Sequence, residues 1–213
     1  MSANSEGARE VLVVRTGTAN LASVLAGLER EGARPRLTAD ADEVRRAPAV
    51  VLPGVGAFAA AMTELRDQGL DAVLRERVLS GAPTLAVCLG LQLLASESQE
   101  SPGTAGLGVF DAPVERFPAD VRVPQLGWNT IRPDAGCRLL QEGDVYFANS
   151  FRLTAAPEGW SAAWSDHAGP FVAALERGAV LACQFHPELS GGFGRALIGR
   201  WLSRAASAEV STC

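Results

Sequence analysis

The chain has 213 residues, 47% hydrophobic and 20% charged, a length that suits one packed core rather than a repeat array. Its net charge is −5, and its 19 basic residues are all arginines without a cluster, which argues against a nucleic-acid partner. No apolar stretch reaches the roughly 18 residues of a membrane span, and residues 1–10 contain no hydrophobic signal region. We therefore expect a cytoplasmic chain with one domain and no membrane contact.

Metal and nucleotide chemistry have little support in the sequence. The four cysteines, at positions 88, 137, 183 and 213, lack the CxxC spacing of zinc sites, and the chain has only two histidines. It also lacks a GxxxxGK[ST] loop and a GxGxxG fingerprint. We expect neither a metal nor a cofactor, and a reaction that needs an imidazole must use His167 or His186.

The first half alternates short apolar strands with helical segments. Strands are predicted at residues 11–14, 35–37, 49–52 and 84–87, and helices at 21–28, 57–66 and 70–80. A further helix start is predicted at 91–95. This alternation predicts an α/β fold with a mostly parallel central sheet flanked by helices.

The pattern changes after residue 96. Residues 101–104 are typical of a loop, and from 108 to 182 short strand-like runs are broken by proline, glycine and aspartate. We expect antiparallel additions to the sheet in this C-terminal half, including a hairpin from 171–175 to 180–182. A closing amphipathic helix follows around residues 197–202.

Cys88 follows the strand at 84–87 and precedes a helix start, with the small residues Ala86 and Gly90 two positions to either side. A sharp strand-to-helix turn requires such small neighbours, and it places the sulfur near the positive end of the helix, where a thiolate is favoured. The pattern is typical of a nucleophile elbow. On this segment alone, the alternative is a buried core cysteine.

The segment Gln184-Phe185-His186-Pro187-Glu188 follows another strand, so His186 and Glu188 are expected at the carboxyl edge of the sheet. There, His186 can take a thiol proton and later protonate an amine leaving group, while Glu188 orients the imidazole. The alternative is a capped turn with a solvated glutamate. His167 lies in a turn-like polar run and is expected at the surface.

The turn Pro53-Gly54-Val55-Gly56 comes directly after the strand at 49–52. Its glycines let backbone N–H groups turn toward a ligand. We expect half of an oxyanion hole here, at Val55, with the N–H of Leu89 as the other half. The alternative is an ordinary strand-to-helix turn, but three candidate segments at one sheet edge favour the catalytic interpretation.

Together, the PGxG turn, the segment Cys88-Leu89-Gly90-Leu91-Gln92 and the late His-Pro-Glu resemble the class I glutamine amidotransferases. The resemblance implies a flavodoxin-like fold and one amidotransferase domain over residues 1–213, with its core at about 11–203. It also implies that glutamine is the substrate and that the site contains the following residues: Cys88 as nucleophile, His186 as base, Glu188 as its orienter, and Gln92, Gly54, Gly56, Ser150 and Phe151 as substrate contacts.

Further segments are similar to the glutaminase subunits of imidazole glycerol phosphate synthases. They are residues 16–21, 53–58, 125–129, 146–151 and 184–190. The likeness implies a heterodimer with a separate (β/α)8-barrel cyclase, which receives ammonia and makes imidazole glycerol phosphate and AICAR in histidine biosynthesis. Trp128 and Asn129 are then expected at or near the partner interface.

Two residues depart from this family pattern: Asn149 stands where a histidine is usual, and Phe151 where a tyrosine is usual. Two alternative functions stay open. One is the glutaminase subunit of pyridoxal phosphate synthase, which shares a Cys…His-x-Glu triad and a barrel partner. The other is a catalytically silent flavodoxin-like module that only holds a partner, and a measurement of glutamate release from glutamine separates it from an enzyme.

Overall fold

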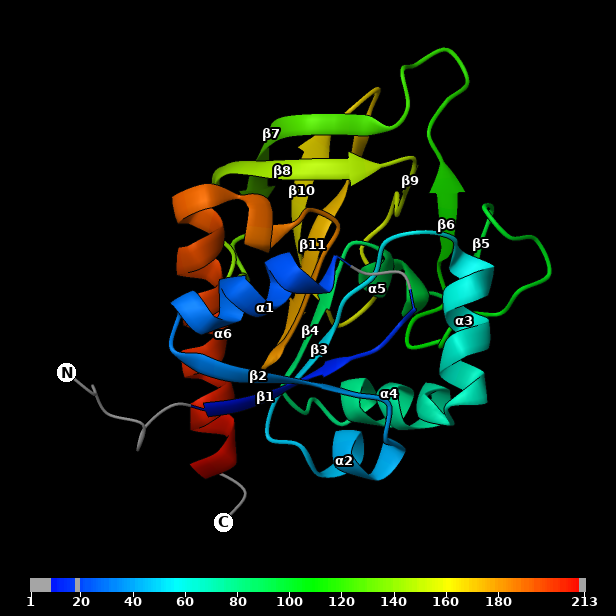
Figure 1. Ribbon diagram of the computed structural model, residues 1–213. Helices are drawn as coiled ribbons and strands as arrows, with labels where there is room; N and C mark the ends of the chain where they lie inside the picture. Colours follow the sequence, from blue (N-terminus) through cyan, green and yellow to red (C-terminus); the bar gives the residue numbers. More distant parts are fainter. Residues whose placement is uncertain (1–8, 18–19, 211–213) are drawn as a thin grey trace.

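The computed structural model describes residues 9–17 and 20–210 (Figure 1). Residues 18 and 19, in one of the family-like segments, lie outside the described residues, as does the cysteine at 213. The first half contains β1 (Arg9–Val14), α1 (Leu21–Arg30), β2 (Ala33–Thr38), α2 (Ala41–Arg46), β3 (Val50–Leu52), α3 (Phe58–Asp67), α4 (Leu70–Leu79), β4 (Thr84–Val87) and α5 (Leu89–Leu93).

The second half is built mainly of strands and ends in one long helix. It contains β5 (Glu97–Ser98), β6 (Pro113–Arg116), β7 (Gln125–Pro133), β8 (Gly143–Asn149), β9 (Phe151–Arg152), β10 (Ser161–Asp166), β11 (Pro170–Arg177), β12 (Val180–Cys183), the 3-10 turn η1 (Pro187–Leu189) and α6 (Gly191–Val210). In the described part of the chain, no helix has both the length and the hydropathy needed to cross a membrane.

One large sheet runs through both halves. Strands β2, β1, β3, β4 and β12 pair in parallel in that order, which is the 2-1-3-4-5 order of flavodoxin-like sheets. Strands β11, β10, β7 and β8 continue the sheet in antiparallel fashion. A small second sheet joins β5, β6 and β9. In such folds ligands bind outside the carboxyl ends of the parallel strands, which directs attention to the ends of β3, β4 and β12.

Alternate residues of the parallel strands face two separate cores. On β1, Leu12 and Val14 pack on the side of α2, α3 and α4, while Val11 and Val13 pack on the side of α1 and α6. The two helical layers lie on opposite faces of the sheet (Figure 1). Strands buried on both faces are continuous apolar runs, as the sequence of the parallel half predicts.

The predicted elements of the first half are confirmed as β1 to β4, α1, α3 and α4. Two details differ from expectation. α5 begins at Leu89, two residues before the predicted start at residue 91, and Cys88 is its N-cap residue. β12 is antiparallel to β11, as the hairpin predicts, but it also pairs in parallel with β4, because its residues are buried on both faces at the centre of the sheet.

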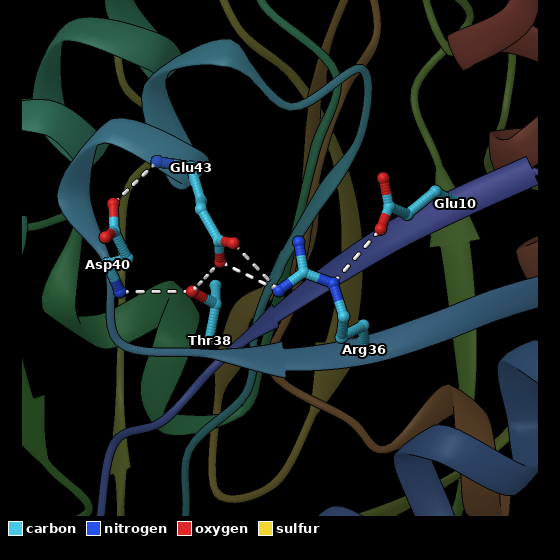
Figure 2. A network of polar contacts seen from close by, with 5 residues as sticks. All are labelled: Glu10, Arg36, Thr38, Asp40 and Glu43. Atoms are coloured by element: carbon cyan, nitrogen blue, oxygen red, sulfur yellow. Dashed lines mark hydrogen bonds and ion pairs between the residues drawn. The ribbon is translucent and has the colours of Figure 1, made fainter.

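An exposed network of charged side chains connects the edge strand β2 to β1 and α2 (Figure 2). Arg36 on β2 binds Glu10 on β1 at 3.1 Å and Glu43 on α2 at 2.9 Å. Thr38 donates a hydrogen bond to Glu43, and Asp40 caps α2 by accepting from the Glu43 N–H at 2.9 Å. The hydrogen bonds to Glu43 and Glu10 raise the pKa of Arg36, and those from Arg36 and Thr38 lower the pKa of Glu43. The network lies on the surface of the fold, over β1, β2 and α2.

Candidate active site

Cys88 occupies the sharp turn between β4 and α5. Its φ of 54° and ψ of −108° lie in a region that costs a non-glycine residue on the order of 1–3 kcal/mol. The Cys88 N–H donates to the Cys183 carbonyl at 2.7 Å, which ties the turn to β12. A Cβ at Gly90 would lie 2.1 Å from the Leu52 carbonyl oxygen, so the turn packs directly on β3 and leaves room only for glycine.

His186 emerges beside this turn because β12 is the parallel neighbour of β4. Its backbone is clamped to β8: the His186 N–H donates to the Tyr146 carbonyl at 2.9 Å, and the Ser190 hydroxyl donates to the His186 carbonyl at 2.6 Å. The imidazole Nδ1 lies 2.9 Å from Oε1 of Glu188, and both side chains are almost fully buried. The ring is therefore fixed in place, with Glu188 on Nδ1 and Cys88 as its other side-chain partner.

The environment of His186 favours its charged form. Burial alone disfavours a charged imidazole, but hydrogen bonds to Cys88 and Glu188 outweigh burial and raise the pKa of His186 to about 10. The imidazole is then protonated at neutral pH. An imidazolium that contacts a cysteine sulfur stabilises the thiolate, which is the nucleophilic form of that side chain.

The other described cysteines have environments that suppress reactivity. Cys183 is fully buried, and this burial raises the pKa of its thiol well above the usual value. Burial, with Glu176 nearby, raises the pKa of the Cys137 thiol to about 11. Neither residue lines the cavity into which Cys88 opens.

The Gly54–Val55 peptide is turned so that its carbonyl faces the turn at Cys88. The Leu89 N–H donates to the Gly54 carbonyl oxygen at 3.2 Å. Because a trans peptide holds its C=O and N–H in opposite directions, the Val55 N–H points the other way. The Thr16 hydroxyl donates to the neighbouring Pro53 carbonyl at 3.2 Å and anchors the start of the turn. In this conformation the two expected oxyanion donors do not converge.

A cavity of about 310 Å³ opens above Cys88. Its walls come from the turn after β3, the turn at Cys88, α5, the loop after β5, the β8–β9 connection and the segment after β12. They consist of Val55, Gly56, Cys88, Leu89, Gln92, Glu100, Ala148, Asn149, Ser150, Phe151 and His186. Most of the site residues expected from the sequence therefore meet here. Gly54 lies beneath the wall with its carbonyl on Leu89, and Glu188 lies behind His186.

Two polar side chains at this site, Glu100 and Gln184, are absent from the sequence-based set, as is the apolar Ala148. Glu100 lines the cavity, and its carboxylate accepts the Phe58 N–H at the start of α3 at 2.7 Å. It lies in a loop with no local pattern that marks it. Gln184 is fully buried with its amide nitrogen 3.8 Å from the Cys88 sulfur. Its place in the segment before His186 is a signal that sequence reasoning did not use.

The two departures from the family pattern lie on the cavity wall. The Asn149 side-chain nitrogen donates to the Phe151 carbonyl at 3.0 Å, and its buried oxygen has no hydrogen-bond partner among the described residues. The Phe151 ring lies under the guanidinium of Arg116, whose carbon is 5.9 Å from the ring centroid. Asn149 therefore holds the β8–β9 turn by a single amide donor.

Residues 17–201 match the family Glutamine amidotransferase class-I. A relative from Mycolicibacterium paratuberculosis, named imidazole glycerol phosphate synthase subunit HisH, is 40% identical over 207 residues, covering 92% of this chain and 98% of the relative. A relative of the same name from Moorella thermoacetica is 40% identical over 190 residues, covering 87% and 90%. The chain belongs to the class I glutamine amidotransferases, in the HisH subunit family.

Solved structures share the fold of this amidotransferase at low sequence identity. A crystal structure of a glutamine amidotransferase superposes with a TM-score of 0.73 at 23% identity, covering 92% of this chain and 98% of the other. A putative GMP synthase component from Thermoplasma acidophilum gives 0.72 at 17% identity, covering 96% and 98%. These likenesses support the flavodoxin-like architecture.

An apolar face of the amidotransferase lies over β7 and η1. Leu126, Trp128 and Leu189 are exposed there by 68%, 59% and 39%. The Trp128 ring packs edge-on against Tyr146 on β8 at 6.1 Å between centroids. A Cβ at Gly191, at the start of α6, would lie 3.7 Å from the Trp128 ring, so the two segments are adjacent. We call Leu126, Trp128 and Leu189 the apolar face below.

A second cavity, of about 420 Å³, borders this face. It is lined by residues 122–129 and His167. The Asn129 side chain donates to the Asp166 carbonyl at 2.8 Å and is half-buried. His167 differs from expectation: it is half-buried, its Nε2 lies 3.0 Å from the Arg122 carbonyl oxygen, and its ring packs edge-on against Phe117. His167 lines this second cavity and does not line the one at Cys88.

Proposed function

We propose that this chain hydrolyses glutamine to glutamate and ammonia through Cys88, His186 and Glu188, and that it passes the ammonia to a (β/α)8-barrel cyclase. That partner makes imidazole glycerol phosphate and AICAR in histidine biosynthesis, in a heterodimer with this chain. The observation that carries the proposal is the strained Cys88 turn beside the 2.9 Å pair of His186 and Glu188. The HisH relatives support the assignment of the pathway and of the partner.

The geometry provides each group that the reaction requires. The Cys88 thiolate attacks the side-chain carboxamide carbon of glutamine, and the His186 imidazolium gives its proton to the leaving nitrogen, which departs as ammonia. A thioester on Cys88 remains. Neutral His186 then takes a proton from water as the water attacks the thioester, and glutamate leaves. Glu188 keeps the ring in the orientation that both steps use. We assign substrate contacts to Gln92.

The remaining substrate contacts line the same wall of the cavity. We assign Gly54, Gly56, Ser150 and Phe151 to them, because Gly56, Ser150 and Phe151 border the cavity and Gly54 precedes the peptide that must donate to the substrate. No metal or cofactor is needed in any of these steps.

The conformation of the Gly54–Val55 peptide provides a switch. In the present state the Leu89 N–H is occupied by the Gly54 carbonyl. Rotation of this one peptide unit frees the Leu89 N–H and turns the Val55 N–H toward the developing oxyanion. One missing oxyanion donor costs about 2.7–4 kcal/mol, or roughly 10²- to 10³-fold in rate. We expect the isolated chain to be a poor glutaminase, and the cyclase with its ribonucleotide substrate to drive the rotation.

The apolar face is our candidate for the cyclase contact. Trp128 belongs to it, and Asn129 on the same strand borders the adjoining cavity. Exposed aromatic side chains next to a cavity are typical of interface hot spots, whose removal costs 2 kcal/mol or more, about 30-fold in affinity. We expect Trp128→Ala to weaken the complex by at least about 10-fold with little change in folding, because its side chain is 59% exposed. Titration with the cyclase by calorimetry measures this.

Glutamate release from glutamine tests the proposal, measured with the chain alone and with the cyclase and its ribonucleotide. We expect low activity alone and at least about 100-fold activation in the complex. Full activity alone, unchanged by the cyclase, contradicts the switch. No glutamate under any condition contradicts the enzyme and favours a silent partner-binding module. Activation only by the barrel subunit of pyridoxal phosphate synthase contradicts the pathway.

Two broader predictions are part of the proposal. We expect one amidotransferase domain over residues 1–213, which the family match over 17–201 supports. We also expect a cytoplasmic location, which the likeness to HisH subunits of a biosynthetic enzyme supports. Fractionation of cells that produce the chain, with detection by an antibody, tests the location.

A further inference from the structure

The Cys88 sulfur has a second polar neighbour besides His186. Gln184 directly follows β12 and is fully buried, and its backbone N–H donates to the Ala173 carbonyl at 2.8 Å. Its side-chain nitrogen lies 3.8 Å from the Cys88 sulfur, within the range of a hydrogen bond to sulfur. The catalytic steps described above give Gln184 no role, so its position beside the nucleophile calls for one.

The other end of the Gln184 amide contacts Gln92. The Gln92 side-chain nitrogen donates to the Gln184 side-chain oxygen at 2.9 Å and to the Phe151 carbonyl oxygen at 3.3 Å. A continuous line of hydrogen bonds therefore runs from β9 through two amides to the nucleophile. Gln92 lines the cavity, whereas Gln184 does not.

The two ends of this line fix its polarity. A thiolate accepts hydrogen bonds, so the Gln184 nitrogen must face Cys88 and its oxygen must face away. That oxygen then requires the Gln92 nitrogen, and the Phe151 carbonyl oxygen at the far end requires the same nitrogen. Both ends thus select one orientation of the Gln92 amide. Its nitrogen is engaged with protein acceptors, and its oxygen is left to accept an N–H from a bound molecule.

We infer that Gln184 is a positioning residue with two effects: its N–H stabilises the Cys88 thiolate, and its oxygen holds the Gln92 amide so that the Gln92 oxygen receives an N–H group of the substrate. The inference rests on the proposed function, because it presumes that the cavity holds glutamine. It couples substrate recognition to the charge of the nucleophile: when the thiolate is present, the orientation of Gln92 is fixed.

Two substitutions of Gln184 separate the two effects. In Gln184→Glu, the carboxylate still accepts from Gln92 but gives no N–H to the sulfur. In Gln184→Met, a side chain of similar length makes neither contact. Two measurements report on them: the pH profile of Cys88 alkylation by iodoacetamide in the free chain, and KM and kcat for glutamine in the complex with the cyclase and its ribonucleotide.

We expect both variants to move the pH midpoint of alkylation upward by about one unit, with the larger shift in Gln184→Glu, whose negative charge opposes the thiolate. In the complex, kcat/KM falls roughly 10- to 100-fold, the range expected when one hydrogen bond to a charged group is lost. KM rises clearly in Gln184→Met, because Gln92 can rotate, and stays near that of the unchanged protein in Gln184→Glu.

Thr84→Val is the matched control. Thr84 is fully buried on the strand that carries Cys88, and its hydroxyl donates to the Ala82 carbonyl at 2.9 Å at the end far from the turn. The Thr84→Val variant loses this hydrogen bond, but residue 84 does not line the cavity. We therefore expect its alkylation profile and its KM for glutamine to be unchanged. Circular dichroism and urea unfolding establish that each variant is folded. If Gln184→Glu does not fold, the alkylation midpoint and KM of Gln184→Met alone test the inference.

A folded Gln184→Met with an unchanged alkylation midpoint and an unchanged KM overturns the inference, even if kcat falls, because a merely structural residue gives that result. The inference also fails if Gln184→Glu raises KM as much as Gln184→Met does. Failure of the proposed function is a different result: the unchanged protein then releases no glutamate with the cyclase, while the alkylation profiles still report on the contact between Gln184 and Cys88.

Discussion

Two charged networks in this protein have similar geometry and different surroundings. On the sheet edge, Arg36 and Glu43 approach to 2.9 Å with side chains that are 47% and 35% exposed (Figure 2). At the site, His186 and Glu188 approach to the same 2.9 Å with side chains that are 6% and 4% exposed. Distance therefore does not separate the structural network from the chemical one. Burial does, because water screens the exposed pair much more strongly than the buried one.

Burial also changes what each network can do. Water solvates Arg36 and Glu43 whether or not they are paired, so their contact adds little to stability and supports no reaction. At the site, each buried polar group depends on the others: Glu188 orients His186, His186 contacts Cys88, and Gln184 joins Cys88 to Gln92. Removing one side chain leaves a buried polar group of its neighbour without a hydrogen-bond partner. We therefore expect substitutions at the site to lower activity far more than substitutions in the exposed network.

The largest effect is expected for Cys88→Ala, because it removes the atom that forms the thioester. We expect glutamate release in the cyclase complex to fall to background, with folding and cyclase binding retained. A mass-labelled glutamine-like alkylating agent should mark Cys88 and spare Cys137 and Cys183, whose thiol pKa values are raised by burial. Glutamate release near the normal rate in Cys88→Ala rejects the nucleophile assignment.

The next largest effect is expected for His186→Ala. A positioned general base contributes about 10²- to 10⁴-fold, so kcat in the complex falls by that factor. Glu188→Gln keeps the shape of the orienting group, and we expect it to lower kcat less than His186→Ala does. His167→Ala is the matched control, since His167 lines the other cavity; steady-state kinetics should show a small change in kcat for it. A larger loss for His167→Ala than for His186→Ala reverses the roles of the two histidines.

The buried network also has a signature in stability against pH. The pKa of His186 is raised to about 10 in the folded protein, from about 6.5 when unfolded. The folded state therefore binds the proton more tightly. The resulting stabilisation is complete below about pH 6.5 and is lost as the pH rises through 10. The four cysteines and the one tyrosine also titrate in this window, so the contribution of His186 is measured as a difference from His186→Ala.

Urea unfolding across this range measures the effect. We expect the difference in unfolding free energy between the unchanged protein and His186→Ala to shrink by at least about 1 kcal/mol from pH 6.5 to pH 10. Cys88→Ala removes one of the contacts that raise the pKa, so its pH dependence should be weaker. A difference between the unchanged protein and His186→Ala that stays constant with pH contradicts a charged His186 in the folded state.

The elements that carry the nucleophile are the ones that sequence predicts best. β3 and β4 are continuous apolar runs, so strand, burial and parallel pairing follow from one pattern. The short strands β5, β6 and β9 hold two to four residues each, too few for any period to show. β12 lies at the centre of the sheet because it pairs with β4, a strand about 95 residues earlier in the chain. Local sequence does not contain that information.

The residues of the site also divide into those that sequence predicts and those that it does not. Cys88, His186 and Glu188 are predictable because each follows a strand at the edge where parallel strands end. The contact of Gln184 with Cys88 is not, since it joins side chains 96 residues apart and depends on their rotamers. The orientation of the Gly54–Val55 peptide is equally hidden, because a glycine permits both orientations at small cost. Sequence therefore predicts the groups that we propose react, and structure supplies the positions of the groups around them.

The smallest effect is expected at the exposed network, and it tests whether burial is the deciding difference. Arg36→Gln removes both ion pairs of the edge, yet Glu10 and Glu43 remain solvated, so neither is left as an uncompensated buried charge. We expect unchanged kcat and KM, and a slight fall of the urea midpoint at low salt. In about 1 M NaCl, where charges are screened within about 3 Å, that fall should vanish. A loss of activity in Arg36→Gln, or a destabilisation that persists in high salt, contradicts the distinction, because the edge network then supports the fold as a buried network does.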